Sequence, residues 1–404
     1  GTALAPRVAL GSANYMVKRD PLGRWGTMGV SGTTIETVTS TGGFGGVHDI
    51  AFTAGGTPLF VGSFGTVGGT VSPNAGLYFP ASNTFGTLTG GTLDNTTGPA
   101  RAVAVAPTGT IYIGGDFNLA AGTRAMYLTQ WNGAYGTLVG GTVHGVAAGT
   151  GVRALALANG TLFFGGRAFT QINGTANAIS IGQWAGAYGT LTGGALSASA
   201  VIRTLAYGLD KRLYIGGAFS SLAGTAGTSV GFWGGAFGTM SGGVFEAAAG
   251  GNVYSIAIEP NAKIAIAGNF ETAGGAGAAG IVAKNDAEWN GVQWSGLGSG
   301  LNVNGDTALA IGNRIVADQE TGDLYLGGKF NRNGPTPLPD GFVRWNGYTY
   351  LPLDIDVSGN GTVYAIAFAN DRTLYAGGTF AGTARAAAVA QIQNIGRAEA
   401  YPTI

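Results

Sequence analysis

Acidic side chains with potential metal-binding or hydrolytic chemistry cluster within residues 302–328. They are Asp306, Asp318, Glu320 and Asp323. Carboxylate oxygens bind hard cations such as Ca²⁺, and a pair of carboxyl groups can hydrolyse a glycosidic bond. The spacing of an EF-hand loop is absent, however, and residues 319–323 have the composition of a polar hairpin turn. We therefore keep these four residues as weak metal candidates and predict neither a metal site nor a cofactor.

Other groups that commonly carry catalysis are scarce. The chain has no cysteine and only two histidines, His48 and His144, which are far apart in the sequence. A cysteine nucleophile is excluded, and a histidine metal site is not expected. A serine nucleophile elbow requires a Gly-x-Ser-x-Gly turn between a strand and a helix, and no such turn is predicted. We predict no catalytic residue and expect a protein that is not an enzyme.

A third set of candidate residues directly follows a short sequence motif that is repeated along the chain. The motif places apolar residues before a pair of small residues, as in LYIGGAF at residues 213–219. Most copies follow the previous one after 50 to 52 residues, and one follows after 60. The copies begin at Leu59, Ile111, Leu162, Leu213, Ile264, Leu324 and Leu374. Seven copies at a nearly constant spacing indicate one repeated structural unit.

The residue directly after the glycine pair differs from copy to copy. A position that varies between repeats is not required by the shared fold, and it is therefore free to contact a ligand. It opens a long loop, where binding residues are commonly found. The ligand-binding candidates are Asp116, Arg167, Asn269 and Lys329.

Each repeat contains signals for four short β-strands. An alternating apolar run, such as ARAVAV at residues 100–105, predicts a strand with one buried face. A short turn joins this run to the glycine motif, which predicts a hairpin. A third strand ends near a tryptophan, and a fourth strand follows a second turn. The tryptophans at the third strand are Trp131, Trp184, Trp233, Trp289 and Trp345.

Seven units of four strands predict an all-β fold, a seven-bladed β-propeller of four-stranded antiparallel blades. A solenoid is the alternative, but a closed ring protects the sheet edges better. Residues 14–29 resemble residues 125–140 and are predicted to supply the outermost strand of the last blade, beside residues 386–394. An N-terminal outer strand would thus close the ring. Pairing of residues 14–29 with a neighbouring subunit is the other possibility.

The domain organisation follows from this count. Residues 1–13 are predicted to be an N-terminal arm, and residues 14–404 a single propeller. Because the sequence begins with Gly1, we expect it to be a processed or excised piece.

The repeats resemble those of kelch-type propellers. Two segments carry the resemblance most clearly: IAIAGNF…AEWNGVQWSGLG at 264–298 and LYLGGKF…FVRWNGYTYLPL at 324–353. The sequence pattern of these segments is similar to that of the kelch-like repeats in fungal cell-polarity cortical markers and in phage and bacterial surface proteins. The resemblance implies a propeller that binds other molecules. The chain departs from the usual pattern where Tyr135, Tyr188 and Phe237 replace the fourth-strand tryptophan.

Composition limits the partners. The chain has 77 glycines, 10% charged residues and a formal net charge of zero. Nucleic-acid binding is not expected because no run of Lys and Arg is present. Membrane insertion is not expected because no apolar run approaches the ~18 residues of a membrane helix. The low charge favours a place in an assembly on an extracellular surface, a cell surface or a virion.

The predicted binding surface is the face of the ring that carries the long loops. The loops between the second and third strands share this face with the connections between blades, whereas the opposite face has tight turns. We expect a non-enzymatic binding or structural module that presents this face to a glycan or a protein, and the spare N-terminal hairpin would allow a homo-oligomer. The alternatives are a carbohydrate-active enzyme that uses acidic loop residues and an intracellular kelch-type scaffold.

Overall fold

The computed structural model describes most of the 404-residue chain. The described residues are 16–21, 25–28, 35–36, 46–93, 98–145, 149–176, 180–194, 196–197, 200–222, 224–226, 229–245, 251–276, 279–304, 310–338, 341–353, 355–356, 362–379 and 383–384. These residues contain no α-helix, and none of their elements could span a membrane as a helix. The predicted arm at 1–13, the segment 386–394 and the candidate Asp306 lie outside the described residues.

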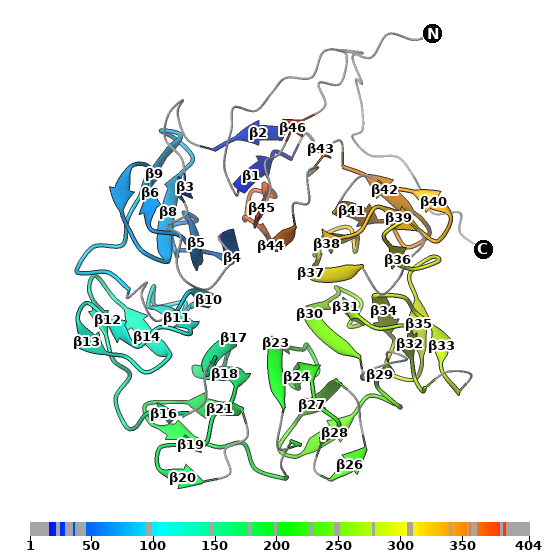
Figure 1. Ribbon diagram of the computed structural model, residues 1–404, viewed down its shortest axis with the longest axis horizontal. Helices are drawn as coiled ribbons and strands as arrows, with labels where there is room; N and C mark the ends of the chain where they lie inside the picture. Colours follow the sequence, from blue (N-terminus) through cyan, green and yellow to red (C-terminus); the bar gives the residue numbers. More distant parts are fainter. Residues whose placement is uncertain are drawn as a thin grey trace.

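Each repeat begins with an antiparallel hairpin, as the alternating run and the glycine motif predict. The first strand of the hairpin lies closest to the ring axis (Figure 1). The first strands are β4 (Gly46–Phe52), β10 (Ala100–Val105), β17 (Gly151–Ala158), β23 (Val201–Tyr207), β30 (Asn252–Ile258), β37 (Ile311–Ala317) and β44 (Val363–Phe368). The second strands are β5 (Pro58–Ser63), β11 (Ile111–Gly115), β18 (Thr161–Arg167), β24 (Leu213–Ala218), β31 (Ile264–Asn269), β38 (Leu324–Lys329) and β45 (Leu374–Gly378).

Two shorter strands complete each unit on its outer side. The third strands are β8 (Ala75–Phe79), β14 (Leu128–Trp131), β21 (Ile181–Trp184), β27 (Val230–Trp233), β34 (Asp286–Trp289), β41 (Phe342–Trp345) and β1 (Met16–Arg19). The fourth strands are β9 (Thr84–Gly86), β15 (Tyr135–Gly136), β22 (Tyr188–Gly189), β28 (Phe237–Thr239), β35 (Trp294–Gly296), β42 (Tyr350–Pro352) and β2 (Trp25–Thr27).

The four strands of each repeated unit form five four-stranded sheets and one eight-stranded sheet among the described residues. The larger sheet consists of two four-stranded units that are joined by one backbone pair, Arg167 with Val201. The units follow one another around a ring, in the order of the sequence (Figure 1). The all-β propeller predicted from the repeats is therefore confirmed.

The ring closes through a sheet that joins the N-terminal strands β1 and β2 to the last repeated hairpin, β44 and β45. Strand β1 pairs with β45, from Met16 with Gly377 to Arg19 with Leu374, and β2 pairs with β1. The N-terminal segment therefore supplies the third and fourth strands of this sheet and not only the outermost one. Residues 386–394 were predicted to lie beside β45, but β1 takes that place. Its register against β45 is the same as that of β14 against β11, so β1 is the third strand of this unit.

The hydrophobic core lies between neighbouring units. In one cluster, Phe163 from β18 packs with Ile202 and Ile215 from the next unit, and each is at least nine-tenths buried. Fully burying a side chain of this size contributes roughly 1.5–3 kcal/mol. The third-strand tryptophans also bridge units, because the indole N–H of Trp184 donates a 2.9 Å hydrogen bond to the carbonyl oxygen of Val139.

The second glycine of the repeated motif allows a close backbone contact. A Cβ atom at Gly217 would lie 2.0 Å from the carbonyl oxygen of Val201 on the neighbouring first strand. The same contact recurs at Gly166 and Gly268, where the distances are 1.9 Å and 2.0 Å. Any side chain at this position would push the two strands apart. Opposite this glycine, the register of the hairpin shifts by one residue in every unit.

The first glycine of the motif accommodates the next unit. A Cβ atom at Gly114 would lie 2.4 Å from the side chain of Val152 on the following first strand. Where the second strand instead carries Ala267, the facing residue is Gly312, whose own Cβ atom would lie 2.9 Å from that of Ala267. The two positions compensate in size, so that the spacing between units is kept.

One face of the ring carries additional small sheets that the sequence analysis treated as loops. The connection entering a unit pairs with the hairpin between its second and third strands, as β16 (Val143–His144) does with β19 (Gln171–Ile172), which in turn pairs with β20 (Thr175–Ala176). We call this side of the ring the long-loop face. The other strands there are β3 (Ile35–Glu36), β6 (Thr66–Val67), β7 (Thr70–Val71), β12 (Leu119–Ala120), β13 (Thr123–Arg124), β25 (Ser221–Leu222), β26 (Thr225–Ala226), β29 (Val244–Phe245), β32 (Thr272–Ala273), β33 (Ile281–Val282), β36 (Leu301–Asn302), β39 (Arg332–Asn333), β40 (Thr336–Pro337), β43 (Ile355–Asp356) and β46 (Thr383–Ala384).

The glycine contact generates the first testable prediction. Gly217→Ala should lower the free energy of unfolding by about 2–3 kcal/mol, because the new methyl group meets a backbone oxygen that cannot move without breaking the hairpin. Gly189→Ala is the matched control, because a Cβ atom there has its nearest neighbour at 3.8 Å, and it should change stability by less than about 0.5 kcal/mol. Urea denaturation of both variants measures the difference, and equal effects would contradict the account.

Candidate functional site

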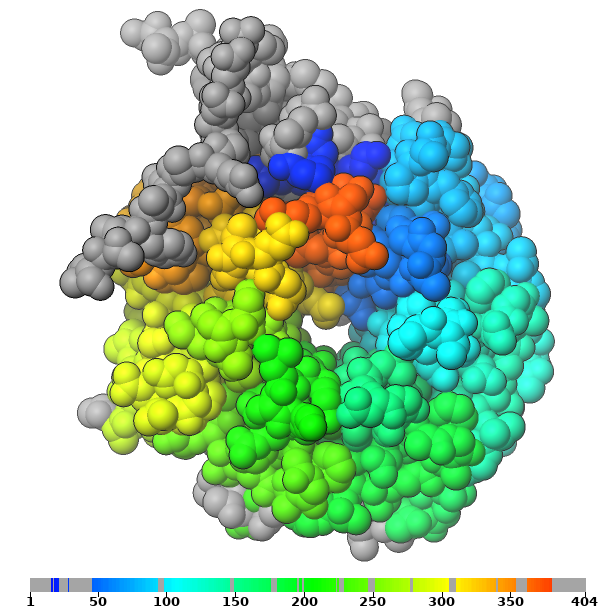
Figure 2. Space-filling model, turned by 180° about the vertical axis from the view of Figure 1, so that it is seen from behind, coloured from blue at the N-terminus to red at the C-terminus, as the bar shows by residue number. Residues whose placement is uncertain are grey.

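The seven shifts in register direct one side chain from each unit into a central cavity. A β-bulge leaves one residue unpaired and re-aims its side chain. The cavity has a volume of about 880 Å³, and the seven bulge residues all line it. Figure 2 shows the opening at the centre of the ring. The bulge residues are His48, Arg101, Arg153, Arg203, Tyr254, Asn313 and Tyr364.

This ring of bulge residues lies toward the long-loop face. Each bulge residue is near the start of its first strand, and the connection that precedes the strand belongs to that face. Lys329, at the end of the second strand β38, also lines the cavity. The mouth of the cavity therefore opens on the long-loop face.

Two of the cavity arginines share one carboxylate. The guanidinium of Arg101 donates two hydrogen bonds to one carboxylate oxygen of Asp116, at 2.8 Å and 2.6 Å. Arg153 approaches the same oxygen only to 4.0 Å. A single carboxylate cannot neutralise both cations, so this part of the cavity keeps a positive charge.

Arg203 has an aromatic partner in place of a carboxylate. Its guanidinium carbon lies 4.6 Å from the ring centre of Tyr254, a cation–π arrangement. Among the described residues, no carboxylate forms an ion pair with Arg203. Among the described residues, the Nε atoms of Arg203 and Arg153 are buried and have no hydrogen-bond acceptor.

Burial and the neighbouring cations lower the pKa values of two cavity arginines. Burial and the charge of Arg101 lower the pKa of Arg153 to about 10, and Arg203 and Arg167 contribute in the same direction. Burial also lowers the pKa of Arg203. Both groups remain protonated at neutral pH, but their charged forms are less stable than in water.

His48 is uncharged at neutral pH and presents one nitrogen as an acceptor. Burial, together with the charge of Arg101, lowers its pKa to about 4. Its Nδ1 atom lies 2.9 Å from the carbonyl oxygen of Ala100, and because a carbonyl only accepts, Nδ1 carries the proton. Nε2 is therefore the unprotonated nitrogen.

The fourth cavity arginine is neutralised. Arg314 forms a 3.0 Å ion pair with Asp49, which directly follows the bulge residue His48. Burial raises the pKa of Asp49, while Arg314 and the backbone N–H groups of Val103 and Ile50 oppose the shift. The 3.0 Å bond from Val103 also ties this carboxylate to the next unit. Asp49 and Arg314 thus form a structural pair.

The four ligand-binding candidates from the sequence lie at the ends of their second strands or, for Asp116, directly after that strand, and their environments differ. Asp116 pairs with Arg101, Lys329 lines the cavity, and Arg167 is exposed while its charge acts on Arg153. Asn269 donates a 3.4 Å hydrogen bond to the carbonyl oxygen of Ala310. Their roles in binding stay predictions.

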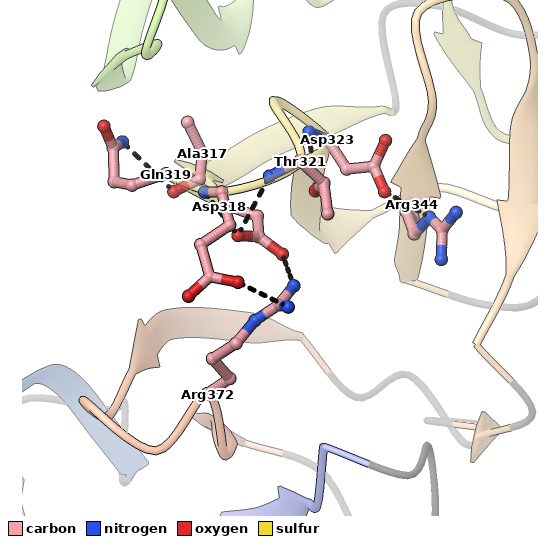
Figure 3. Close-up of polar contacts among 8 residues, drawn as sticks. Ala317, Asp318, Gln319, Thr321, Asp323, Arg344 and Arg372 are labelled. Carbon is pink, nitrogen blue, oxygen red and sulfur yellow. Dashed lines mark hydrogen bonds and ion pairs between the residues drawn. The ribbon is translucent and has the colours of Figure 1, made fainter. Parts of the chain in front are cut away.

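The weak metal candidates that the structure describes contact arginines. Asp318 pairs with Arg372 from the neighbouring unit at 2.5 Å, and Glu320 contacts the same guanidinium at 2.8 Å (Figure 3). Asp323 pairs with Arg344 at 2.9 Å. In the described residues, no group of three or more His, Cys, Asp or Glu is placed to hold a metal ion.

Sequence reasoning missed the bulge residues. The runs ARAVAV, VRALAL and IRTLAY each place an arginine second, where it fits a simple alternation between buried and exposed residues. The signal that could have identified them is the shared position: Arg101, Arg153 and Arg203 stand at the same place in three consecutive repeats. Ring closure converts that regular spacing into a spatial cluster.

Comparisons with known proteins support the fold. No protein-family model and no curated protein matches the sequence. The extracellular domain of a hybrid two-component system from B. thetaiotaomicron superposes with a TM-score of 0.53 at 10% identity, over 87% of this chain and 39% of that one. The GH74 xyloglucanase from Xanthomonas campestris superposes with a TM-score of 0.51 at 12% identity, over 86% of this chain and 52% of that one.

These likenesses are of fold alone, because the sequence identities are low. This chain spans little more than half of the length of the xyloglucanase and less than half of the two-component domain. They agree with a β-propeller, while the kelch-like type of the repeat stays a prediction.

The ion pair at Asp318 generates the second prediction. Arg372→Gln should lower the free energy of unfolding by about 1 kcal/mol at pH 7, a modest value because the Arg372 side chain is 42% exposed. Burial alone would raise the pKa of Asp318, but the backbone N–H of Glu320 and the Arg372 guanidinium hold it below its usual value. Such a group stabilises the fold above its unfolded pKa, and the contribution is lost as the pH falls through the folded one.

The difference in stability between the wild type and Arg372→Gln should therefore shrink below about pH 4. Thermal denaturation between pH 3 and pH 7 would measure it. Arg332→Gln is a suitable control, because within the described part of the chain the Arg332 side chain donates to one acceptor, the carbonyl oxygen of Pro335 in its own loop. A difference that stays constant with pH would show that the ion pair is not its cause.

Proposed function

We propose that this chain is a non-enzymatic binding module that works on an extracellular surface or a virion and presents the long-loop face of its propeller to a glycan or to another protein. The observation that carries the proposal is the central cavity of about 880 Å³, whose seven bulge residues lie toward that face. Ligand sites of proteins are commonly concave and of this size. The side chains at its mouth differ from unit to unit, although the backbone around them repeats.

The two faces of the ring differ in a way that favours one binding surface. The long-loop face carries small sheets whose backbone is paired, for example β16 with β19. Paired backbone holds the exposed side chains of these loops in fixed positions, which reduces the entropy lost on binding. The opposite face is built from short turns, such as residues 106–110 between β10 and β11.

A steric block on each face tests the proposal. Because the chain has no cysteine, a single one can be introduced at Thr123 on the long-loop face or at Thr108 in a turn of the opposite face, both exposed in the same unit. Each cysteine is then coupled to a polyethylene glycol chain. Binding to an array of neutral and acidic oligosaccharides should weaken at least tenfold with the Thr123→Cys conjugate and stay unchanged with the Thr108→Cys conjugate.

The same samples distinguish the enzymatic alternative. The oligosaccharides are incubated with the unmodified protein and assayed for new reducing ends. Cleavage would contradict a non-enzymatic module and favour a carbohydrate-active propeller. Equal loss of binding with both conjugates would contradict the assignment to the long-loop face.

A further inference from the structure

We propose that Arg101, Arg153 and Arg203 form an oxyanion-binding site at the mouth of the central cavity, which takes the carboxylate, sulfate or phosphate group of a small polar ligand. The inference rests on the proposed binding function and names the chemical class of the ligand. It is carried by three independent features of the cavity: its charge, its unused hydrogen-bond donors and its size.

The charge of the cavity is positive although the chain is neutral overall. Five basic side chains gather there, together with two carboxylates, Asp49 and Asp116, which leaves three positive charges. The basic residues are Arg101, Arg153, Arg203, Arg314 and Lys329. Buried charges in proteins are normally paired. A bound anion would supply the missing partner.

The unused donors point to the same place. Arg101 and Arg314 each have a carboxylate within 3.0 Å, whereas Arg153 reaches one only at 4.0 Å and Arg203 reaches none among the described residues. The Nε atoms of Arg153 and Arg203 are buried without an acceptor there, as is that of Arg314, which already has Asp49 as its partner. A planar guanidinium fits the two oxygens of a carboxylate or phosphate group, so these two arginines retain the donors that an oxyanion accepts.

The dimensions indicate an anion that is part of a larger molecule. A volume of about 880 Å³ is far more than a single inorganic ion needs and lies in the range of sites for small organic ligands. Tyr254, Tyr364 and Asn313 contribute aromatic and amide groups to the same ring of bulge residues. The uncharged His48 adds a hydrogen-bond acceptor that suits a hydroxyl group.

Arg212 provides a matched control for the arginines of the site. Its guanidinium lies 4.4 Å from the ring centre of Phe232, as that of Arg203 lies over Tyr254, and it belongs to the same unit. It differs in facing a carboxylate, Asp210 at 3.7 Å, and in lying outside the central cavity. Arg212→Gln therefore removes a similar charge and a similar ring contact without touching the proposed site.

Calorimetric titration of the full chain tests the site. The probes are sodium sulfate, inorganic phosphate and sodium glucuronate, with glucose as the neutral probe, at low ionic strength because salt screens such binding. At least one anion should bind at one site per chain, and its affinity should fall at least tenfold in Arg153→Gln and in Arg203→Gln. Arg212→Gln should bind as the wild type does. Tighter binding of glucuronate would identify a carboxylate on an organic carrier, and tighter binding of the inorganic anions a free ion.

A thermal measurement separates binding from a structural role. Without anion, Arg153→Gln and Arg203→Gln should melt at the temperature of the wild type or above it, because each removes a repelled charge. They should also lose the rise in melting temperature that the anion gives the wild type. Failure of every anion to bind the wild type would overturn the site. Unchanged affinity in both variants would overturn it as well, and a lower melting temperature in that case would assign the arginines to the fold.

The experiments distinguish failure of the oxyanion-binding site from failure of the proposed binding function. If both variants still bind oligosaccharides on the array and the Thr123→Cys conjugate does not, the long-loop face binds without an oxyanion site. If the anions bind and neither conjugate affects the oligosaccharides, the site exists but the face has been assigned wrongly.

Discussion

The structure depends on a close contact between two backbones. In each unit the second glycine of the repeated motif faces the start of the first strand, and at Gly217 a Cβ atom would lie only 2.0 Å from a carbonyl oxygen. The hairpin shifts its register at this point, and the bulge sends one side chain toward the ring axis. The glycine that makes the fold possible therefore also determines which residue faces the cavity.

The same constraint separates scaffold from chemistry. The residues before each bulge are small or apolar and pack between units, as Ile202 and Val253 do without any exposed surface. The bulge residue itself meets the open cavity, so its side chain is free to differ, from Arg203 to Tyr254 to Asn313. Three neighbouring units carry arginine at this position, and the result is a concentrated positive charge inside a protein whose net charge is zero.

Much of the fold could be predicted from the sequence because its signals are local and repeated. The alternating runs, the glycine pairs and the tryptophans each mark a strand, and their spacing indicates the ring. The sequence predicts that the N-terminal segment closes the ring, but it does not predict that β1 pairs directly with β45. The similarity of one strand to another does not specify its place in a sheet. The small sheets were missed because pairs of two-residue strands leave no periodic pattern.

The candidate site was harder to predict for a related reason. A search for runs of basic residues finds nothing at Arg101, Arg153 and Arg203, because about 50 residues separate each from the next. Only closure of the ring brings them to one cavity. The position after the glycine pair was chosen for its variability, and of its four candidates only Lys329 lines the cavity, whereas all seven bulge residues do.

Thiol labelling of single-cysteine variants tests the central claim most directly, because the chain has no cysteine of its own. Cysteines at bulge positions should react with a small water-soluble reagent in the folded protein, and cysteines one residue earlier should be protected until the protein unfolds. Suitable pairs are Arg101 and Ala100, Arg203 and Ile202, Tyr254 and Val253, and Tyr364 and Val363. Equal reactivity within these pairs, or faster reaction at the earlier residue, would contradict the account.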